Sequence, residues 1–211
     1  MREGVKGVDL YKQLPVSITG HPAYAFLATG GDCSSGNPAI REFLAPASGD
    51  RFLDLGCCVN IINHRLHEWP SAYFGVDVSA ENIGLLKRHV AAKGIAVGGL
   101  HAGRIDRLPF TDGYFRIAAC VGVLEYYPLE YAEAVLREAR RVLAPGGRFY
   151  VDIPNVGHPG FPAMRRIEEH MGRPIMLGIP GSRFEAMLAG LFVVDRVDAT
   201  RAMTGFFLRA A

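Results

Sequence analysis

Short apolar runs alternate with amphipathic stretches along the chain from residue 51 onward. Three runs end at a glycine or an acid or enter a turn: Arg51–Gly56 (RFLDLG), Tyr73–Val78 (YFGVDV) and Tyr114–Leu124 (YFRIAACVGVL). Runs of this length and composition are typical of buried strands. Arg148–Pro154 (RFYVDIP) predicts a further strand, and residues 95–103 (IAVGGLHAG) are weakly strand-like.

Helical periodicity lies between these strands. Ser79 predicts the N-cap of one helix, with Glu81 in its first turn and Lys93-Gly94 at its end. Residues 129–143 carry one apolar face at helical spacing and end at an Ala-Pro-Gly-Gly break. A short amphipathic stretch opens at Asn37-Pro38 and ends at Pro46.

The C-terminal part of the chain differs in composition and in its predicted elements. Residues 155–180 are rich in proline and glycine, with a short helix expected over Met164–Met171. A further helix is expected after them, with Ser182 as its cap, and residues 191–210 predict two strands close in sequence. Alternating strands and helices predict a doubly wound α/β fold, and two closing strands with a short connection predict an antiparallel hairpin at one edge.

Length and composition suit one globular domain. The chain has 211 residues, of which 49% are hydrophobic and 21% charged, so a disordered or fibrous protein is excluded. No apolar window approaches the roughly 18 residues of a membrane helix. Together with the lack of an apolar N-terminal stretch, this makes the cytoplasm the expected location.

The charge balance argues against nucleic acid as a partner. The chain has 23 basic and 21 acidic residues, and a nucleic-acid-binding protein usually carries a basic surplus or stripe. The densest basic cluster, Arg137, Arg140 and Arg141, lies beside Glu133 and Glu138 and is expected to be a solvated helix face. The oligomeric state stays open.

The four cysteines, Cys33, Cys57, Cys58 and Cys120, predict neither a metal site nor a disulfide framework. Two of them are adjacent, which does not fit C-x-x-C metal spacing and rarely allows a disulfide. We expect reduced thiols, with Cys57 and Cys120 as small core residues.

The ends of the first two predicted strands carry the main chemical signal. Gly56 ends the first strand, and a small residue there lets backbone N–H groups approach a ligand beside a helix N-terminus. Asp77 ends the second strand, where a carboxylate can accept hydrogen bonds from a ribose diol. This pair fits a nucleoside ligand and does not distinguish NAD from S-adenosylmethionine.

Four ordered motifs carry a family resemblance. They are LDLGCC (Leu53–Cys58), GVDVS (Gly75–Ser79), LPFTDGYFR (Leu108–Arg116) and LAPGGRFYV (Leu143–Val151). Over roughly residues 50–155 the chain resembles the class I S-adenosylmethionine-dependent methyltransferases, in a branch that acts on small molecules. The resemblance implies a mostly parallel, seven-stranded, Rossmann-like sheet with an antiparallel closing hairpin.

The resemblance also implies a set of cofactor contacts. Asp54 and Gly56 would line the methionine side, Asp77 would bind the ribose hydroxyls, and Val78 would pack on the adenine. Ile105 would offer its backbone N–H near the adenine ring. Val121 and Gly122 would lie beneath the transferred methyl group, and S-adenosylhomocysteine would be the product.

The sequence departs from the family pattern at several of these positions. Cys58 and Asn60 stand where the family usually has glycine, and Cys58 adds a side chain near the expected cofactor. Arg104 replaces an acid that would hold the adenine amino group, and a guanidinium cannot accept a hydrogen bond. Asp106, two residues on, is the candidate substitute. Arg116 replaces the usual Asp after Phe115.

Candidate catalytic groups follow the strands that the resemblance places under the methyl group. Glu125, Tyr126 and Tyr127 come after the fourth strand, and His158 follows the fifth, where it could act as a base. Packing at a strand end or an unreactive loop position is the competing interpretation for each. His21 is a weaker candidate.

No metal site is expected near the two histidines placed on the first helix. These are His64 and His67, and neither has a carboxylate at ligand spacing.

The predicted domain organisation is one methyltransferase-like unit. It has an N-terminal cap or lid (1–48), a cofactor-binding core (49–154), an insertion or lid (155–180), and a closing helix and strands (181–211). Aromatic and Met side chains in both lids suggest a partly apolar pocket: Tyr11, Tyr24, Phe26, Phe161 and Met164.

The expected activity is methyl transfer to a small-molecule or lipid-like acceptor. Two alternatives remain: a protein of the same fold that has lost catalysis and serves in binding or regulation, and a nicotinamide-dependent oxidoreductase. The absence of a G-x-G-x-x-G motif argues against the oxidoreductase.

Overall fold

The structure is a computed structural model and describes residues 17, 20, 22, 38–58 and 60–211. Most of the predicted N-terminal lid, residues 1–48, lies outside the described residues. Tyr11, His21, Tyr24, Phe26 and Cys33 lie outside them as well.

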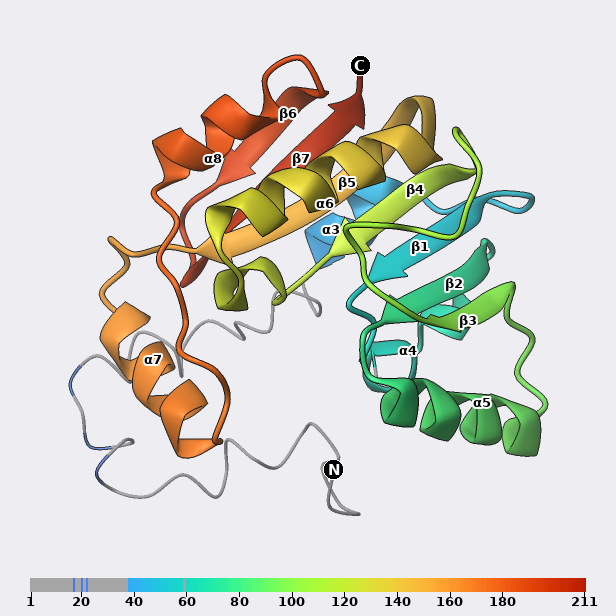
Figure 1. Ribbon diagram of the computed structural model, residues 1–211, viewed down its shortest axis with the longest axis horizontal. Coiled ribbons are helices and arrows are strands. Elements are labelled where there is room, and N and C mark those ends of the chain that lie inside the picture. Colours follow the sequence, from blue (N-terminus) through green and yellow to red (C-terminus); the bar gives the residue numbers. More distant parts are fainter. Residues whose placement is uncertain (1–16, 18–19, 21, 23–37, 59) are drawn as a thin grey trace.

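Seven strands form a single sheet in the order β3-β2-β1-β4-β5-β7-β6 (Figure 1). They are β1 (Arg51–Leu55), β2 (Ala72–Asp77), β3 (Gly99–Ala102), β4 (Phe115–Cys120), β5 (Leu143–Pro154), β6 (Phe192–Asp198) and β7 (Met203–Ala210). The first five strands pair in parallel, whereas β7 is antiparallel to both β5 and β6. The predicted doubly wound sheet with an antiparallel closing hairpin is therefore confirmed.

Helices cover both faces of the sheet. The described helices are α3 (Pro38–Leu44), α4 (Asn60–Asn63), α5 (Ala80–Lys93), α6 (Leu129–Val142), α7 (Phe161–His170) and α8 (Gly181–Leu188), with short 3-10 turns η4 (Leu66–Glu68) and η5 (Leu124–Tyr126). Helices α3, α4 and α5 pack into one apolar cluster, and α6 and α8 pack into the other. Helix α7 lies beyond the carboxyl end of β5 (Figure 1).

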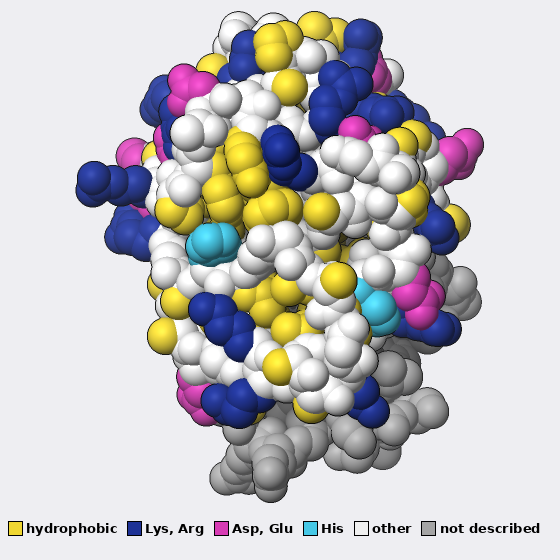
Figure 2. Space-filling model, turned by 90° about the vertical axis from the view of Figure 1, so that its right-hand side faces the viewer, with side chains coloured by type: hydrophobic (Ala, Val, Ile, Leu, Met, Phe, Trp, Pro, Cys, Tyr) yellow, Lys and Arg dark blue, Asp and Glu magenta, His cyan; other side chains and the backbone are white. Residues whose placement is uncertain are grey.

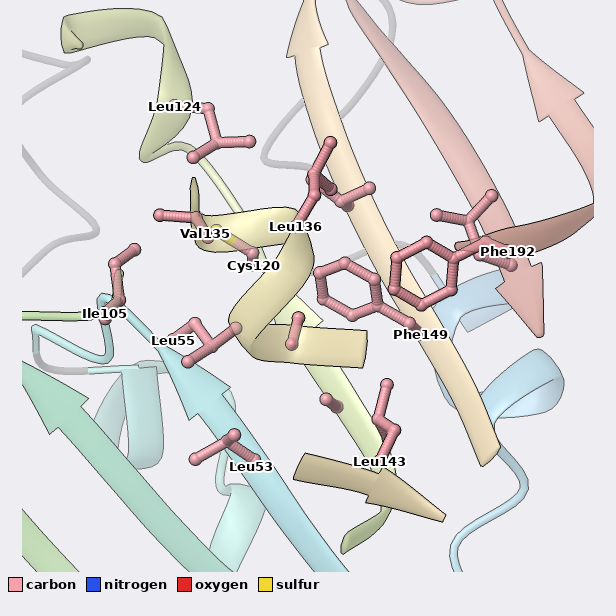
Figure 3. Packing of buried hydrophobic residues seen from close by; sticks show 14 of the residues in the cluster. Leu53, Leu55, Ile105, Cys120, Leu124, Val135, Leu136, Leu143, Phe149 and Phe192 are labelled. Atoms are coloured by element: carbon pink, nitrogen blue, oxygen red, sulfur yellow. The ribbon is translucent and has the colours of Figure 1, made fainter. Parts of the chain in front are cut away.

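Strand periodicity divides the core between the two faces. On β1, Leu53 and Leu55 belong to the α6 side and Phe52 to the α3–α5 side, and all three are buried. Figure 3 shows the α6 side, where Val135 and Leu136 point toward the sheet among side chains of β1, β4 and β5. The polar residue between Leu53 and Leu55 is Asp54, which therefore points toward the α3–α4 side.

The predicted helix signals after β2 are confirmed. Ser79 caps α5 by accepting a hydrogen bond from the Asn82 N–H, at 3.1 Å. Gly94 ends the helix with φ +63°, a left-handed conformation that costs glycine little. The predicted helix over residues 129–143 is confirmed as α6, and β5 begins directly after it at Leu143.

Several predicted boundaries are wrong. The strand predicted over Arg148–Pro154 begins five residues earlier, at Leu143, which pairs with Phe115. The strand predicted over Tyr114–Leu124 ends at Cys120, because Gly122 turns the backbone at φ +66°. Helix α7 begins at Phe161 and not at Met164. Ser182 is not a cap, since Pro180 occupies the N-cap position of α8 and no side chain caps that end.

The first helix is shorter than expected. Helix α4 has a single turn, so His64 follows it and His67 lies in η4. Arg65 between them has φ +51°, which is incompatible with a continuing right-handed helix.

Two further observations concern membrane-spanning helices and the cysteines. Within the described residues, no helix is long and apolar enough to cross a membrane. Cys57 and Cys120 are fully buried thiols, as expected for small core residues.

Candidate active site

The turn after β1 is built from backbone hydrogen bonds to β2. The Gly56 and Cys57 N–H groups both donate to the Val76 carbonyl oxygen, at 2.9 and 3.0 Å. Gly56 adopts φ +72°, and a β-carbon there would lie only 2.4 Å from a methyl carbon of Val123. Glycine is required at this position both by the backbone angle and by the close approach of Val123.

Cys58 continues this turn in a conformation that glycine normally supplies. Its φ is +37°, in the region that side chains with a β-carbon rarely adopt. Its N–H donates to Asp77 Oδ2 at 2.8 Å, which joins the turn after β1 to the end of β2. The thiol lies 3.9 Å from Asn82 Nδ2, at the start of α5.

Asp77 is largely buried at the carboxyl end of β2. Its Oδ1 accepts from the Ser79 N–H at 2.8 Å, so the same side chain organises the start of α5. Each carboxylate oxygen has two lone pairs and can accept a further hydrogen bond from a ligand. The neighbouring Val78 side chain is 64% exposed, an apolar surface at the same strand end.

Asp54 is buried beneath this turn. Its oxygens accept hydrogen bonds from the Tyr73 hydroxyl at 2.8 Å and from Asn60 Nδ2 at 3.3 Å. Burial raises the pKa of Asp54 to about 6, against the opposing effect of these hydrogen bonds. Asn60 is thus more than a substitute for glycine, because it holds the Asp54 side chain.

A cavity of about 280 Å³ opens on the α3–α4 side of Asp54. It is lined by apolar and polar side chains of α3, β1, the α4–η4 segment and the β4 end: Pro38, Ile40, Arg41, Phe52, Asp54, Asn60, His64, Leu66, Trp69, Ala119 and Val121. The cavity has room for a short polar chain next to a buried carboxyl group.

The loop after β3 carries the residues expected near an adenine ring. Ile105 is buried, and Arg104 forms a bidentate ion pair with Asp106, with Nε at 2.8 Å from Oδ1. The Arg104 guanidinium also lies 5.4 Å from the centroid of the Tyr131 ring, which stacks on Tyr127 at 4.3 Å. Arg104 thus holds Asp106 in place, and its hydrogen bond lowers the pKa of that carboxyl group.

A clamp from α6 supports this loop, and we did not predict it from the sequence. Arg141 donates to the carbonyl oxygens of Leu108 and Phe110, at 3.2 and 2.8 Å, and pairs with Asp112 and Glu138. Glu138 in turn accepts from the Leu108 N–H at 2.8 Å. The expectation that this cluster is merely a solvated helix face is therefore wrong for Arg141, although it holds for the exposed Arg137–Glu133 pair.

Buried carboxyl groups surround the turn after β4. The Gly122 N–H donates to Oδ1 of the fully buried Asp152 at 2.8 Å. Glu125 is 3% exposed, and its Oε1 would lie 3.7 Å from a β-carbon placed on Gly122. Its Oε2 is buried without a hydrogen-bond partner among the described residues. Burial, reinforced by the nearby Asp152 charge, raises the pKa of Glu125 to about 8.

Two further catalytic candidates, Tyr126 and His158, have structural partners. Tyr126 donates its hydroxyl to Glu168 Oε2 at 2.6 Å, which ties η5 to α7. His158 Nδ1 accepts from the Gly160 N–H at 3.0 Å within its own loop. Glu125 differs from both, because it places a carboxyl group beside Gly122 and its Oε2 has no hydrogen-bond partner among the described residues.

The structure therefore brings most of the predicted site residues to one edge. Asp54, the Gly56–Cys58 turn, Asp77, Ile105, and the Val121–Gly122 turn all lie at or just beyond the carboxyl ends of β1 to β4. In open α/β sheets this edge is where ligands bind. No group of three or more metal-ligating side chains was found among the residues that the structure describes.

Comparison with known proteins agrees with this geometry. Residues 53–151 match a family profile described as a methyltransferase domain. Over these residues, somewhat less than half of its length, the chain is similar to a methyltransferase domain. The matched segment runs from β1 into β5 and so contains the whole edge described above.

A curated relative is similar over part of the chain. A ubiquinone biosynthesis O-methyltransferase from Xylella fastidiosa (strain 9a5c) is 28% identical over 122 residues, which cover 56% of this chain and 49% of the relative. The chain thus corresponds to about half the length of this relative.

Two solved structures share the fold. A methyltransferase from Methanosarcina mazei superposes with a TM-score of 0.66 at 18% identity, covering 82% of this chain and 97% of that one. A geranyl diphosphate C-methyltransferase from Streptomyces coelicolor A3(2), in complex with Mg²⁺, geranyl-S-thiolodiphosphate and S-adenosyl-L-homocysteine, has a TM-score of 0.65 at 16% identity. The superposition covers 92% of this chain and 84% of that one.

Proposed function

We propose that this methyltransferase transfers a methyl group from S-adenosylmethionine to a small-molecule or lipid-like acceptor. In this proposal Asp77 binds the ribose hydroxyls, Asp54 and Gly56 line the methionine side, and Ile105 and Asp106 face the adenine. Val121 and Gly122 lie beneath the transferred group. When bound, the cofactor supplies an electrophilic methyl group, and the protein aligns it with the acceptor and excludes water.

The observation that carries the proposal is the junction between the two strand ends. The Cys58 N–H to Asp77 Oδ2 hydrogen bond, at 2.8 Å, fixes the glycine turn against the acidic residue. One ligand lying across this junction would reach both the backbone of the turn and the carboxylate.

The surrounding residues fit an adenosyl ligand. Val78 exposes an apolar side chain next to Asp77, which a planar base would cover. Asp54 is buried beside a cavity of about 280 Å³, which suits the amino acid end of the ligand.

Glu125 is the residue we propose as the general base. A hydroxyl acceptor gains the methyl carbon and loses its proton, and the proton must go to a nearby acceptor group. Because the pKa of Glu125 is raised to about 8, its carboxylate is basic enough to take that proton near neutral pH. Transfer to a hydroxyl should therefore become faster as the pH rises through this value.

The acceptor class rests on the lid composition and the charge pattern. Phe161 and Met164 of α7 are half-buried apolar side chains at the carboxyl edge. On the face shown in Figure 2, the Lys and Arg side chains are scattered among acidic and hydrophobic ones, without a continuous basic stripe. Two of the proteins named above are named for small molecules, the ubiquinone biosynthesis O-methyltransferase and the geranyl diphosphate C-methyltransferase. We propose a small acceptor rather than nucleic acid, and a cytoplasmic location in keeping with the buried thiols of Cys57 and Cys120.

Two residues favour the alternative of a binding protein without catalysis. Cys58 strains the turn at φ +37°, and Arg104 occupies the Asp106 carboxylate that would otherwise accept from adenine. Both features weaken the affinity for the cofactor. Measuring that affinity therefore distinguishes an active methyltransferase from a binding protein without catalysis.

Calorimetry with S-adenosylhomocysteine tests the proposal. We expect binding by the unmodified chain and a loss of about tenfold or more in Asp77→Asn, since an amide keeps only one acceptor oxygen and no charge. The matched control is Glu185→Gln, an exposed acid on α8, which should bind normally.

The outcomes are distinct. No detectable heat at millimolar ligand would favour the binding protein without catalysis. Equal affinity of Asp77→Asn and the unmodified chain would remove Asp77 from the site.

A further inference from the structure

A second cavity, of about 380 Å³, lies against α7. Its walls come from α7 and the segment that follows it: Pro162, Arg165, Arg166, Glu168, Glu169, Arg173, Pro174, Ile175 and Met176. Residues 155–180 supply all of these walls, so the cavity belongs to the segment predicted to be a lid.

The cavity combines guanidinium groups with an apolar wall. Neither Arg165 nor Arg166 forms an ion pair with any residue that the structure describes, and both are exposed. Ile175 is 76% exposed, the largest exposed fraction among the large hydrophobic side chains described. An exposed aliphatic side chain beside unpaired cations is suited to a ligand with an apolar part and an anionic part.

The acidic residues of the cavity do not cancel this charge. Glu168 already accepts from the Tyr126 hydroxyl at 2.6 Å and pairs with Arg173 at 3.3 Å. Three arginines therefore face two carboxylates, one of which is satisfied by protein groups. A guanidinium can donate two parallel hydrogen bonds to a phosphate or a carboxylate.

Two hydrogen bonds connect the walls of the cavity and the residue that follows them to η5, the 3-10 turn that carries Glu125. Glu168 stands between it and Tyr126, and the Leu177 N–H donates to the Glu125 carbonyl oxygen at 2.5 Å. Glu125 in turn lies beside Gly122. A ligand held by Arg165 and Arg166 would thus lie against α7 and the segment after it, which contact the turn that carries the proposed base.

We infer that this cavity binds the methyl acceptor, and that the acceptor carries an anionic phosphate or carboxylate group on an apolar body. The inference rests on the proposed function, because it places the acceptor next to the same site. A bare anion would leave most of the volume and the apolar wall unused. An uncharged lipid would leave Arg165 and Arg166 without a partner.

Calorimetry of the full chain with octyl phosphate tests the inference. Octyl phosphate should bind, hexyl phosphate should bind more weakly by about fourfold for each methylene group that becomes buried, and inorganic phosphate should bind at least tenfold more weakly than octyl phosphate. Octanol, which lacks the anion, should also bind at least about tenfold more weakly.

Paired variants identify the residues responsible. In Arg165→Gln/Arg166→Gln we expect a loss of about tenfold or more in affinity for octyl phosphate. The control Lys87→Gln/Arg88→Gln removes the same charge from an exposed basic pair on α5, and should bind normally.

Several results would overturn the inference. Inorganic phosphate binding as tightly as octyl phosphate would indicate a simple anion site, and octanol binding as tightly would show that the arginines are not used. Loss of octyl phosphate binding on saturation with S-adenosylhomocysteine would place the probe in the cofactor site. Absence of octyl phosphate binding, with S-adenosylhomocysteine still bound, would overturn the inference and leave the proposed function intact.

Discussion

Cys58 has a strained backbone conformation at a position where the proposed function needs its N–H group. Its backbone has φ +37°, yet its N–H must point at Asp77 to close the proposed cofactor turn. A residue with a β-carbon pays about 1 kcal/mol or more for this conformation, which glycine adopts freely. The strain is tolerated because the neighbouring backbone hydrogen bonds of Gly56 and Cys57 to Val76 fix the turn.

We therefore predict that Cys58→Gly stabilises the protein by about 1 kcal/mol. Urea unfolding at equilibrium measures this change. Cys58→Ala is the matched control, since it removes the thiol and keeps the strained backbone angle. If Ala stabilised the chain as much as Gly, the thiol and not the backbone would be the source of the effect.

The positions of single residues were predictable where the backbone dictates them. Gly56 and Asp77 follow from strand ends that any parallel sheet brings to one edge. The partners of side chains were not predictable in this way. The Arg104–Asp106 pair depends on a loop conformation, and the contact from Tyr126 to Glu168 joins residues that are 42 positions apart.

At the scale of elements, Arg141 of α6 holds the loop that precedes β4. Its guanidinium bonds two backbone carbonyl oxygens of this loop and the carboxyl group of Glu138, which itself accepts from the Leu108 N–H. The loop also contains Ile105 and Asp106, the residues proposed to face the adenine. Arg141 thus positions the adenine side of the site through the backbone of Leu108 and Phe110.

Replacing Arg141 by Met should loosen this loop. The apolar stem is kept and the hydrogen bonds are lost, so we expect a destabilisation of about 2 kcal/mol and weaker binding of S-adenosylhomocysteine. Faster hydrogen exchange at the Leu108 amide would locate the effect. The control Arg137→Met lies on the same helix in an exposed pair with Glu133 and should change stability by less than about 1 kcal/mol.

Element identity was easier to predict than element boundaries. Helix α5 carries a cap at each end and α6 a clear apolar face, and both were predicted within a residue or two. The end of β4 was not, because residues 121–124 remain apolar after the strand stops. Their hydrophobicity reflects burial beneath the site and not continued pairing, which the pattern cannot distinguish. The early end of α4 was not predicted, because only the left-handed Arg65 reveals the break.

At the scale of the molecule, buried carboxyl groups gather along one edge of the sheet. Asp54, Asp77, Glu125 and Asp152 are all buried at the carboxyl ends of β1, β2, β4 and β5. Burial of a carboxyl group favours its protonated form, and in Glu125 and Asp54 the pKa is raised to about 8 and about 6. The edge that is suited to ligand binding therefore makes folding sensitive to pH.

Glu125 dominates this sensitivity near neutral pH. Its pKa is about 8 in the folded chain and 4.5 in the unfolded reference, so between these values the folded state binds one more proton than the unfolded state. The stability that this proton supplies is complete at low pH and is lost as the pH rises toward about 8, with a slope on the order of 1.4 kcal/mol per pH unit.

Glu125→Gln, which mimics the protonated side chain, should remove that slope. The free energy of unfolding of the variant should therefore rise relative to that of the unmodified chain between about pH 5 and about pH 8. Urea unfolding across this range measures the difference, and the exposed Glu130→Gln on α6 should follow the unmodified chain. If the free energy of unfolding depended on pH in the same way in Glu125→Gln and the unmodified chain, Glu125 would ionise normally. That result would contradict its proposed role as a base that acts near neutral pH.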